Sequence, residues 1–237
     1  MKTILKYSIF FLLVIPFNLN AQSSIRSNLS STEIKSMNDA VQFYWDWKSD
    51  EDPIKAVTLL EEVTLKHQSN WIAPYWAAYI STQIANSSDK NKIEHLEKAQ
   101  SYFNQAIGRY AYTTKKEDNY ISSNFNALHS LILRLTGFYF KSINQEIKAK
   151  EYSDKSIEQL NAGIKKSAEN PILMVLAATE VATTENKNFG NIIAAIALLE
   201  KAKKEFEKIK NRDKTDITYW NEHWIDPWLN NLRPPSK

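Results

Sequence analysis

The sequence predicts an all-α protein in which antiparallel helix pairs stack into a superhelical array of about four pairs. Three observations support this fold class. Apolar side chains recur with the helical period from residue 33 to residue 229, and almost no segment alternates as a strand does. The chain has only four glycines in 237 residues, too few for the turns of a sandwich or barrel. A short pattern of small and large residues also returns four times.

The N-terminal segment resembles a secretory signal peptide. Lys2 and Lys6 precede a short apolar stretch over residues 8–17, and Ala21 is a small residue at the expected cleavage position. The alternative is a membrane anchor, but the stretch is well short of the roughly 20 residues that span a bilayer. We therefore expect a signal peptide over 1–21, cleavage before Gln22, and a periplasmic or secreted protein without a membrane span.

The mature chain begins with a polar segment. Residues 22–32 are rich in serine, which predicts a flexible leader before a helical repeat domain over 33–229 and a tail over 230–237. Thr32 and Glu33 are a plausible cap for a first helix over 33–48. Asp52 and Pro53 open the second helix, because Asp caps free N–H groups and Pro is tolerated in the first turn.

The remaining helices are inferred from apolar stripes and from end signals. Asn170 and Pro171 start the seventh helix, Asn188–Gly190 breaks the chain before the eighth, and Pro227 interrupts the last. The third to sixth helices are expected over 70–86, 93–110, 118–140 and 153–168. The eighth is expected over 192–210, and the last over 216–229, where it would cap the array.

The repeated pattern lies in the second helix of each pair. A small residue is followed four positions later by a large apolar residue, and three positions after that by another compact residue. The four copies are Ala56-Leu60-Val63, Ala99-Phe103-Ala106, Ser156-Leu160-Gly163 and Ala195-Leu199-Ala202. Small residues let two helix backbones approach, while the large residue fills the groove between them. A short helix pair cannot bury its apolar face alone, so the pairs are expected to stack.

This pattern resembles the second-helix motif of the tetratricopeptide-repeat family, and Tyr75–Tyr79 resembles its first-helix motif. The resemblance covers nearly all of residues 33–229. Spacings of 43, 57 and 39 residues between copies depart from the family's repeat of about 34, and we assign the widest to an insertion around 141–150. The resemblance implies a right-handed superhelix whose first helices line an inner surface that binds proteins or peptides. The layout is also similar to small exported repeat proteins of Bacteroidetes.

Composition and motifs exclude several classes of function. The net charge of +3 includes two lysines of the signal peptide, so the mature chain is nearly neutral and nucleic acid is not an expected partner. There is no cysteine, Gly-x-Ser-x-Gly turn or P-loop. The four histidines, His67, His95, His129 and His223, lack the spacing of a metal site and are interpreted as surface or core-edge residues. We expect no catalytic residue, metal or cofactor.

Candidate binding residues lie on the third and fifth helices. Tyr75, Tyr79 and Gln83 share a stripe that could present a polar tip toward the inner surface. Asn124 lies one turn before Leu128. Arg134 interrupts an apolar run, and its charge is either paired or snorkelling, or it binds an anion in a groove.

The C-terminal tryptophans Trp220, Trp224 and Trp228 recur every fourth residue. They either cover the last repeat as a cap or form a platform for a peptide or glycan. The sequence thus favours an exported, non-catalytic protein that binds an unidentified protein or peptide. The alternative is a ligand- or glycan-handling protein of the cell envelope that uses the aromatics around Tyr75–Tyr79 or Trp220–Trp228.

Overall fold

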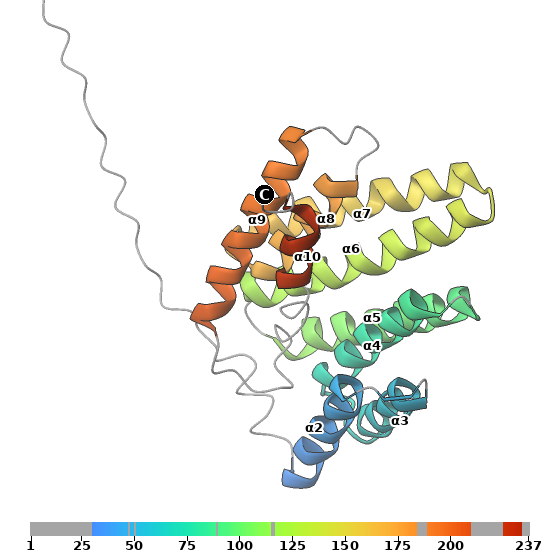
Figure 1. The fold of residues 1–237 in the computed structure, drawn as a ribbon. Coiled ribbons are helices and arrows are strands. Elements are labelled where there is room, and N and C mark those ends of the chain that lie inside the picture. The colour runs from blue at the N-terminus through green and yellow to red at the C-terminus, as the bar shows by residue number, and fades with distance from the viewer. Residues whose placement is uncertain are drawn as a thin grey trace, which may run out of the picture.

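A computed structural model describes residues 30–46, 48–49, 51–88, 90–114, 117–183, 189–209 and 225–233. Within these ranges the protein has nine α-helices and no strand (Figure 1), which confirms the predicted all-α class. The helices are α2 (Ser31–Trp45), α3 (Glu51–Lys66), α4 (Ile72–Ser87), α5 (Lys92–Thr113), α6 (Asn119–Ser142), α7 (Glu146–Lys166), α8 (Pro171–Thr183), α9 (Phe189–Lys208) and α10 (Ile225–Leu232). None of the described helices is long and apolar enough to cross a membrane.

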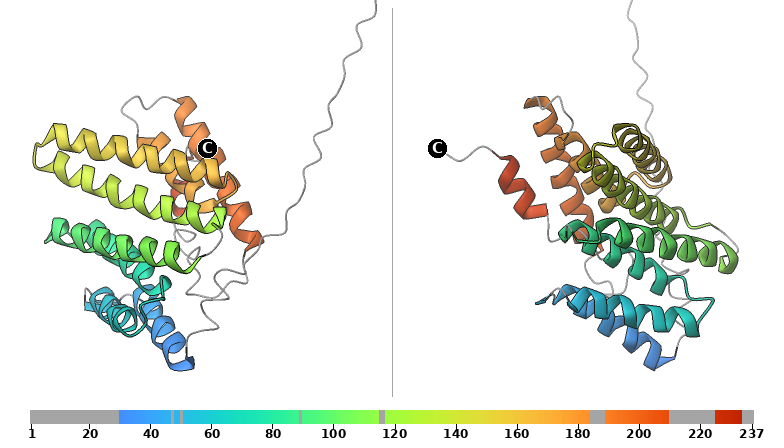
Figure 2. Two further views of the ribbon diagram at one scale, coloured as in Figure 1. Left: turned by 180° about the vertical axis from the view of Figure 1, so that it is seen from behind. Right: turned by 90° about the vertical axis from the view of Figure 1, so that its right-hand side faces the viewer.

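The helices form hairpins that lie one above another. The most extensive contacts join α2 with α3, α4 with α5, α6 with α7, and α8 with α9, while α10 packs on α9. The first helix of each hairpin also contacts the first helix of the next, from α2 through α4 and α6 to α8. Figure 2 shows the same order of layers from two further sides, with the long α6–α7 hairpin extending beyond its neighbours.

The repeated small–large–small pattern packs as expected. All twelve of its residues are buried, and Leu60 and Leu199 are fully enclosed. Gly163 marks the closest approach, because an added Cβ would lie 2.8 Å from Cδ2 of Leu173 on α8. The pattern therefore identifies helix faces that pack tightly against neighbouring helices.

Helix α4 lies at the centre of the aromatic core. Trp71, at its N-terminal boundary, and Tyr75, Trp76 and Tyr79 within it are fully buried. Their rings pack mostly edge to face, as in the contact of Trp76 with Tyr79 at a centroid distance of 5.6 Å, an arrangement that suits the ring quadrupoles. A helix that is apolar on all sides must be surrounded by others, and α4 contacts α2, α3, α5 and α6.

Several helix starts differ from the prediction. Helix α9 begins at Phe189, three residues early, so Gly190 lies within it and does not break the chain before it. Helix α2 begins at Ser31, two residues early, because Ser30 and Glu33 form a capping box in which each side chain accepts the other's backbone N–H. The proposed insertion around 141–150 is wrong. Helix α6 continues to Ser142 and α7 begins at Glu146, with Asn144 in the left-handed conformation at φ 58°. The widest repeat spacing therefore reflects longer helices, not an inserted loop.

The described part of the expected C-terminal helix is α10, which begins at Ile225, and the expected residues 216–224 lie outside the described residues. Pro227 lies in the first turn of α10, where the first N–H groups of a helix need no intrahelical acceptor. Ile225 and Leu229 are buried, and Trp228 packs partly buried against the core. The predicted signal peptide, most of the leader, Trp220, Trp224 and His223 lie outside the described residues.

Candidate functional site

Three of the five predicted binding residues lie in the core. Tyr75, Tyr79 and Asn124 have no exposed surface. The Tyr75 hydroxyl donates to the backbone oxygen of Asn124 at 3.4 Å, and the Tyr79 hydroxyl lies 3.5 Å from that of Tyr44. Burial raises the pKa of Tyr79 well above its ordinary value and that of Tyr44 to about 12. These side chains contribute to core packing and present no surface to a partner.

Asn124 belongs to a buried polar network that the sequence analysis did not identify. The Asn170 amide donates to Oγ of Ser123 at 2.7 Å and to Oδ1 of Asn124 at 2.8 Å. Oδ1 of Asn170 in turn accepts the backbone N–H of Ile172 at the start of α8. The network therefore fixes the start of α8 against α6.

Asn70 caps α4 in the same way. Its Oδ1 accepts the backbone N–H groups of Ile72 and Ala73. The Arg109 guanidinium, on α5, donates to the carbonyl oxygens of Thr64, His67 and Asn70 at 3.1 Å each. Arg109 thus binds the carbonyls left open where α3 ends, and no local sequence signal marked it.

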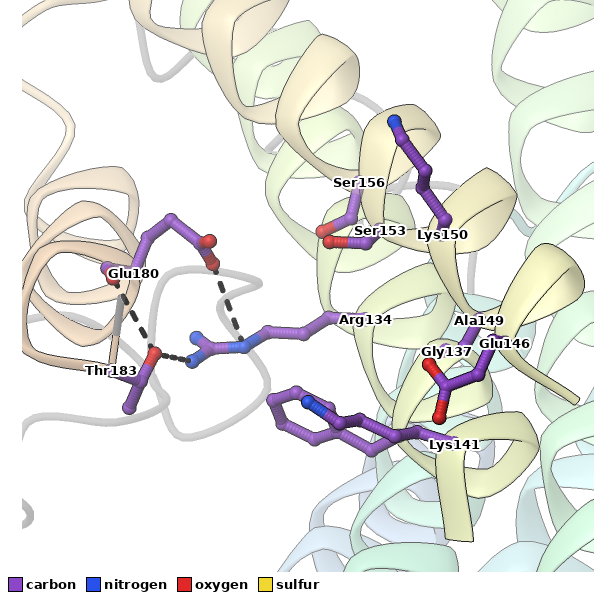
Figure 3. Close-up of a pocket in the computed structure, with 11 residues that line it drawn as sticks. Arg134, Gly137, Lys141, Glu146, Ala149, Lys150, Ser153, Ser156, Glu180 and Thr183 are labelled. Carbon is purple, nitrogen blue, oxygen red and sulfur yellow. Dashed lines mark hydrogen bonds and ion pairs between the residues drawn. The ribbon is translucent and has the colours of Figure 1, made fainter. Parts of the chain in front are cut away.

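The other two predicted residues differ in exposure, because Gln83 is partly exposed whereas Arg134 is buried. Gln83 is partly exposed on α4. Arg134 on α6 reaches toward α8, where it donates to the Thr183 hydroxyl at 2.9 Å and forms an ion pair with Glu180 at 3.8 Å (Figure 3). Its guanidinium carbon lies 5.2 Å from the ring centroid of Phe138. Burial lowers the pKa of Arg134 from its ordinary value, and the nearby Glu180 partly opposes this shift. The structure brings Arg134 together with none of the other four predicted residues.

A cavity of about 470 Å³ lies between α5, α6 and α7. We call it the aromatic cleft. Its walls include Phe103, Ile107 and Tyr110 from α5, Phe125 and His129 from α6, and Gln159 and Lys166 from α7. Since α5 and α7 belong to successive hairpins, the cleft depends on how these hairpins stack.

Aromatic rings and one imidazole build the wall of the cleft. The His129 ring stacks on Phe103 with centroids 4.5 Å apart and planes 21° apart. Phe125 packs against both Phe103 and Tyr110, at centroid distances of 6.1 and 5.2 Å. Burial lowers the pKa of His129, with a hydrogen bond to Gln159 opposing the shift. His129 is therefore a neutral donor and acceptor at neutral pH.

Charge is confined to one part of the cleft lining. Nζ of Lys166 lies 2.7 Å from Oε1 of Glu117, and both side chains remain substantially exposed. The hydrogen bond from Lys166 lowers the pKa of Glu117, and one with Ser122 adds to this effect. An exposed ion pair of this kind is weak in water. A ligand carboxylate can compete with Glu117 for the ammonium group of Lys166.

The described residues contain no cluster of three or more His, Asp or Glu side chains that could hold a metal ion. The sequence did not indicate that His129 and Lys166 line the same cavity, because they lie on different helices and neither one interrupts the residue pattern of its helix. Phe103 belongs to the repeated pattern that predicted close helix packing, whereas Tyr110 and Phe125 were not singled out. No sequence signal distinguished the aromatic residues that face a cavity.

No family model matches the chain, and neither does any curated protein sequence. Among solved structures, the HusA haemophore from Porphyromonas gingivalis superposes with a TM-score of 0.68. The match covers 86% of this chain and 94% of HusA, at 17% sequence identity. The two proteins share a fold. At this identity the likeness concerns the helical architecture, and residue roles are not carried across.

Proposed function

We propose that this chain is an exported, non-catalytic binding protein for a flat, largely apolar ligand that carries carboxylates, of the tetrapyrrole class. The aromatic cleft is the observation that carries this proposal. Its combination of stacked rings, a neutral imidazole and a lysine suits such a ligand. The fold shared with a haemophore adds independent support.

The cleft matches the ligand class in shape and chemistry. A volume of about 470 Å³ falls within the usual range of small-molecule pockets, roughly 300–1,000 Å³. Flat aromatic walls favour a flat aromatic ligand, because offset stacking adds to the gain from burying apolar area. Lys166 can pair with a ligand carboxylate, and the neutral His129 offers a nitrogen of the type that binds haem iron.

Export is part of the proposal. We propose that residues 1–21 are removed as a signal peptide and that the mature chain begins at Gln22 in the periplasm or outside the cell. A binding protein that captures a ligand from the surroundings requires this location.

Protein or peptide binding is the second candidate. The contacts among α2, α4, α6 and α8 favour it, since the same order of contacts would give a tetratricopeptide-like superhelix with a continuous inner face. Gln83 on α4 is the predicted residue that retains exposure near this row. Loss of partner capture by Gln83→Ala, in a chain with an unchanged melting temperature, would favour this candidate.

Titration with haemin and with metal-free protoporphyrin, followed by absorbance, tests the proposed function. We expect saturable binding of both ligands at one site per chain. Ala111→Trp should abolish binding, because Ala111 is exposed in the cleft lining and a bulky side chain there fills the space. Tyr112→Ser is the matched control, since Tyr112 is the next residue and is 91% exposed outside the lining.

The two probes also separate the roles of His129 and Lys166. Lys166→Gln should weaken both ligands by similar factors, because both carry carboxylates. His129→Ala should change the haemin spectrum more than that of the metal-free ligand if the imidazole binds iron. Absence of saturable binding, or equal binding by wild type and Ala111→Trp, would contradict the proposed function.

A further inference from the structure

A second cavity, of about 320 Å³, lies between the distal half of the α6–α7 hairpin and the end of α8. Arg134, Gly137 and Phe138 line it from α6, Ala149 and Ser153 from α7, and Thr183 from α8. Figure 3 shows Arg134 crossing this space toward α8. We call it the Arg134 cavity. Its lining shares no residue with that of the aromatic cleft.

The side chain of Arg134 is nine-tenths buried, but only some of the N–H groups of its guanidinium make hydrogen bonds. Its side chain is 9% exposed. Nη2 donates to the Thr183 hydroxyl at 2.9 Å and to the Thr179 carbonyl at 3.5 Å, and Nε lies 3.8 Å from Glu180. Among the described residues, Nη1 makes no hydrogen bond, and it is not one of the fully enclosed polar atoms that lack a partner. Because Arg134 lines the cavity, an acceptor there can pair with the N–H groups of Nη1.

We propose that the Arg134 cavity binds a small organic monocarboxylate, with its carboxylate on the guanidinium of Arg134 and its apolar body against Phe138 and Ala149. Guanidinium N–H groups match carboxylate oxygens in geometry and charge. Phe138 is 52% exposed and Ala149 is buried beside the cavity, so both offer apolar surface to a ligand.

The charges around the cavity favour a singly charged ligand. Arg134, Lys141 and Lys150 line it together with Glu146 and Glu180. Lys150 is also held by Asp154 on its own helix, at 2.6 Å. The cations are therefore nearly balanced by carboxylates, and a dianion such as phosphate would meet Glu180 and Glu146 with little compensating charge.

Calorimetric titration of the mature chain with sodium benzoate tests this proposal, with inorganic phosphate as the comparison anion. We expect saturable benzoate binding and weaker or no phosphate binding. Arg134→Gln should weaken benzoate binding by about tenfold or more, since it removes a charge-assisted hydrogen bond. Arg134 also contacts α8, so circular dichroism must show that the variant remains folded.

Ser153→Trp provides a second variant that leaves Arg134 in place. Ser153 is exposed on α7 and lines the cavity, so a tryptophan there should block benzoate without disturbing the core. Lys166→Gln alters only the aromatic cleft and should bind benzoate as the wild type does. Benzoate binding that survives Ser153→Trp, phosphate binding tighter than benzoate binding, or no benzoate binding to the wild type would each overturn the proposal. None of these outcomes depends on whether the chain binds a tetrapyrrole.

Discussion

Replacing Gly163 with alanine tests whether the small positions of the repeated pattern are required by close helix packing. A Cβ at residue 163 would lie 2.8 Å from Cδ2 of Leu173 and 3.0 Å from Cβ of Asn126. Leu173 is 1% exposed, so its side chain has little room to move away. Gly108 on α5 is the matched control, because a Cβ there would meet nothing within 4 Å.

The two substitutions should change stability in opposite directions. Alanine in a helix interior is favoured over glycine by about 1 kcal/mol, so Gly108→Ala should raise the free energy of unfolding by about 0.5–1 kcal/mol. At Gly163 the same gain is opposed by overpacking, which costs about 1–3 kcal/mol. We therefore expect Gly163→Ala to be less stable than Gly108→Ala by roughly 1–3 kcal/mol.

Urea denaturation followed by far-ultraviolet circular dichroism measures this difference. Both variants should show the slope of the wild type, so that a shifted midpoint reports stability alone. If Gly163→Ala is stabilised as much as Gly108→Ala, the close approach of α7 to α8 is wrong. The explanation given for the repeated pattern then fails with it.

Three further predictions concern other parts of the chain. Arg109→Met should lower the free energy of unfolding by about 1.5–3 kcal/mol, because three carbonyl groups lose a charged donor; a change below about 0.5 kcal/mol would contradict its capping role. Burial holds the pKa of His129 below its ordinary 6.5, so the unfolded chain takes up this proton first and stability falls as pH drops below about 6.5. The His129→Gln variant should lose less stability than the wild type between about pH 7 and pH 5. Equal losses would show that protonation of His129 does not cause the loss of stability at low pH. Deleting residues 214–237 should lower the melting temperature, because burial of the Ile225 and Leu229 side chains each contributes about 1.5–3 kcal/mol to the free energy of unfolding. An unchanged melting temperature would show that α10 is not a cap.

The helices were predictable because their signals are local. The pattern around Leu60, Leu160 and Leu199 depends only on the helical period and on side-chain size, and both can be determined within one helix. The α6–α7 turn was missed because the first turns of α7 bury little besides Ala149. Without an apolar stripe, periodicity alone placed the helix start at residue 153 instead of Glu146.

The site was less predictable because it depends on tertiary packing. Tyr75 and Tyr79 were chosen for their stripe, but α4 is enclosed on every side and leaves them no exposed surface. His129 and Lys166 lie on the two helices of the α6–α7 hairpin, and they meet Phe103 on α5 only when this hairpin stacks on α5. The stacking geometry is not encoded in the period of any one helix. Arg134 was identified because a charge inside an apolar run is a local anomaly, although its partners on α8 were not predictable.

The central claim is that the aromatic cleft binds a flat, carboxylate-bearing ligand. The most direct test is haemin titration of the wild-type chain beside the Ala111→Trp and Tyr112→Ser variants. We expect the wild type and Tyr112→Ser to bind one haemin per chain with the same affinity, and Ala111→Trp to show no saturable binding. Haemin binding that is absent from the wild type, or that is unchanged by Ala111→Trp in a folded chain, would contradict the claim.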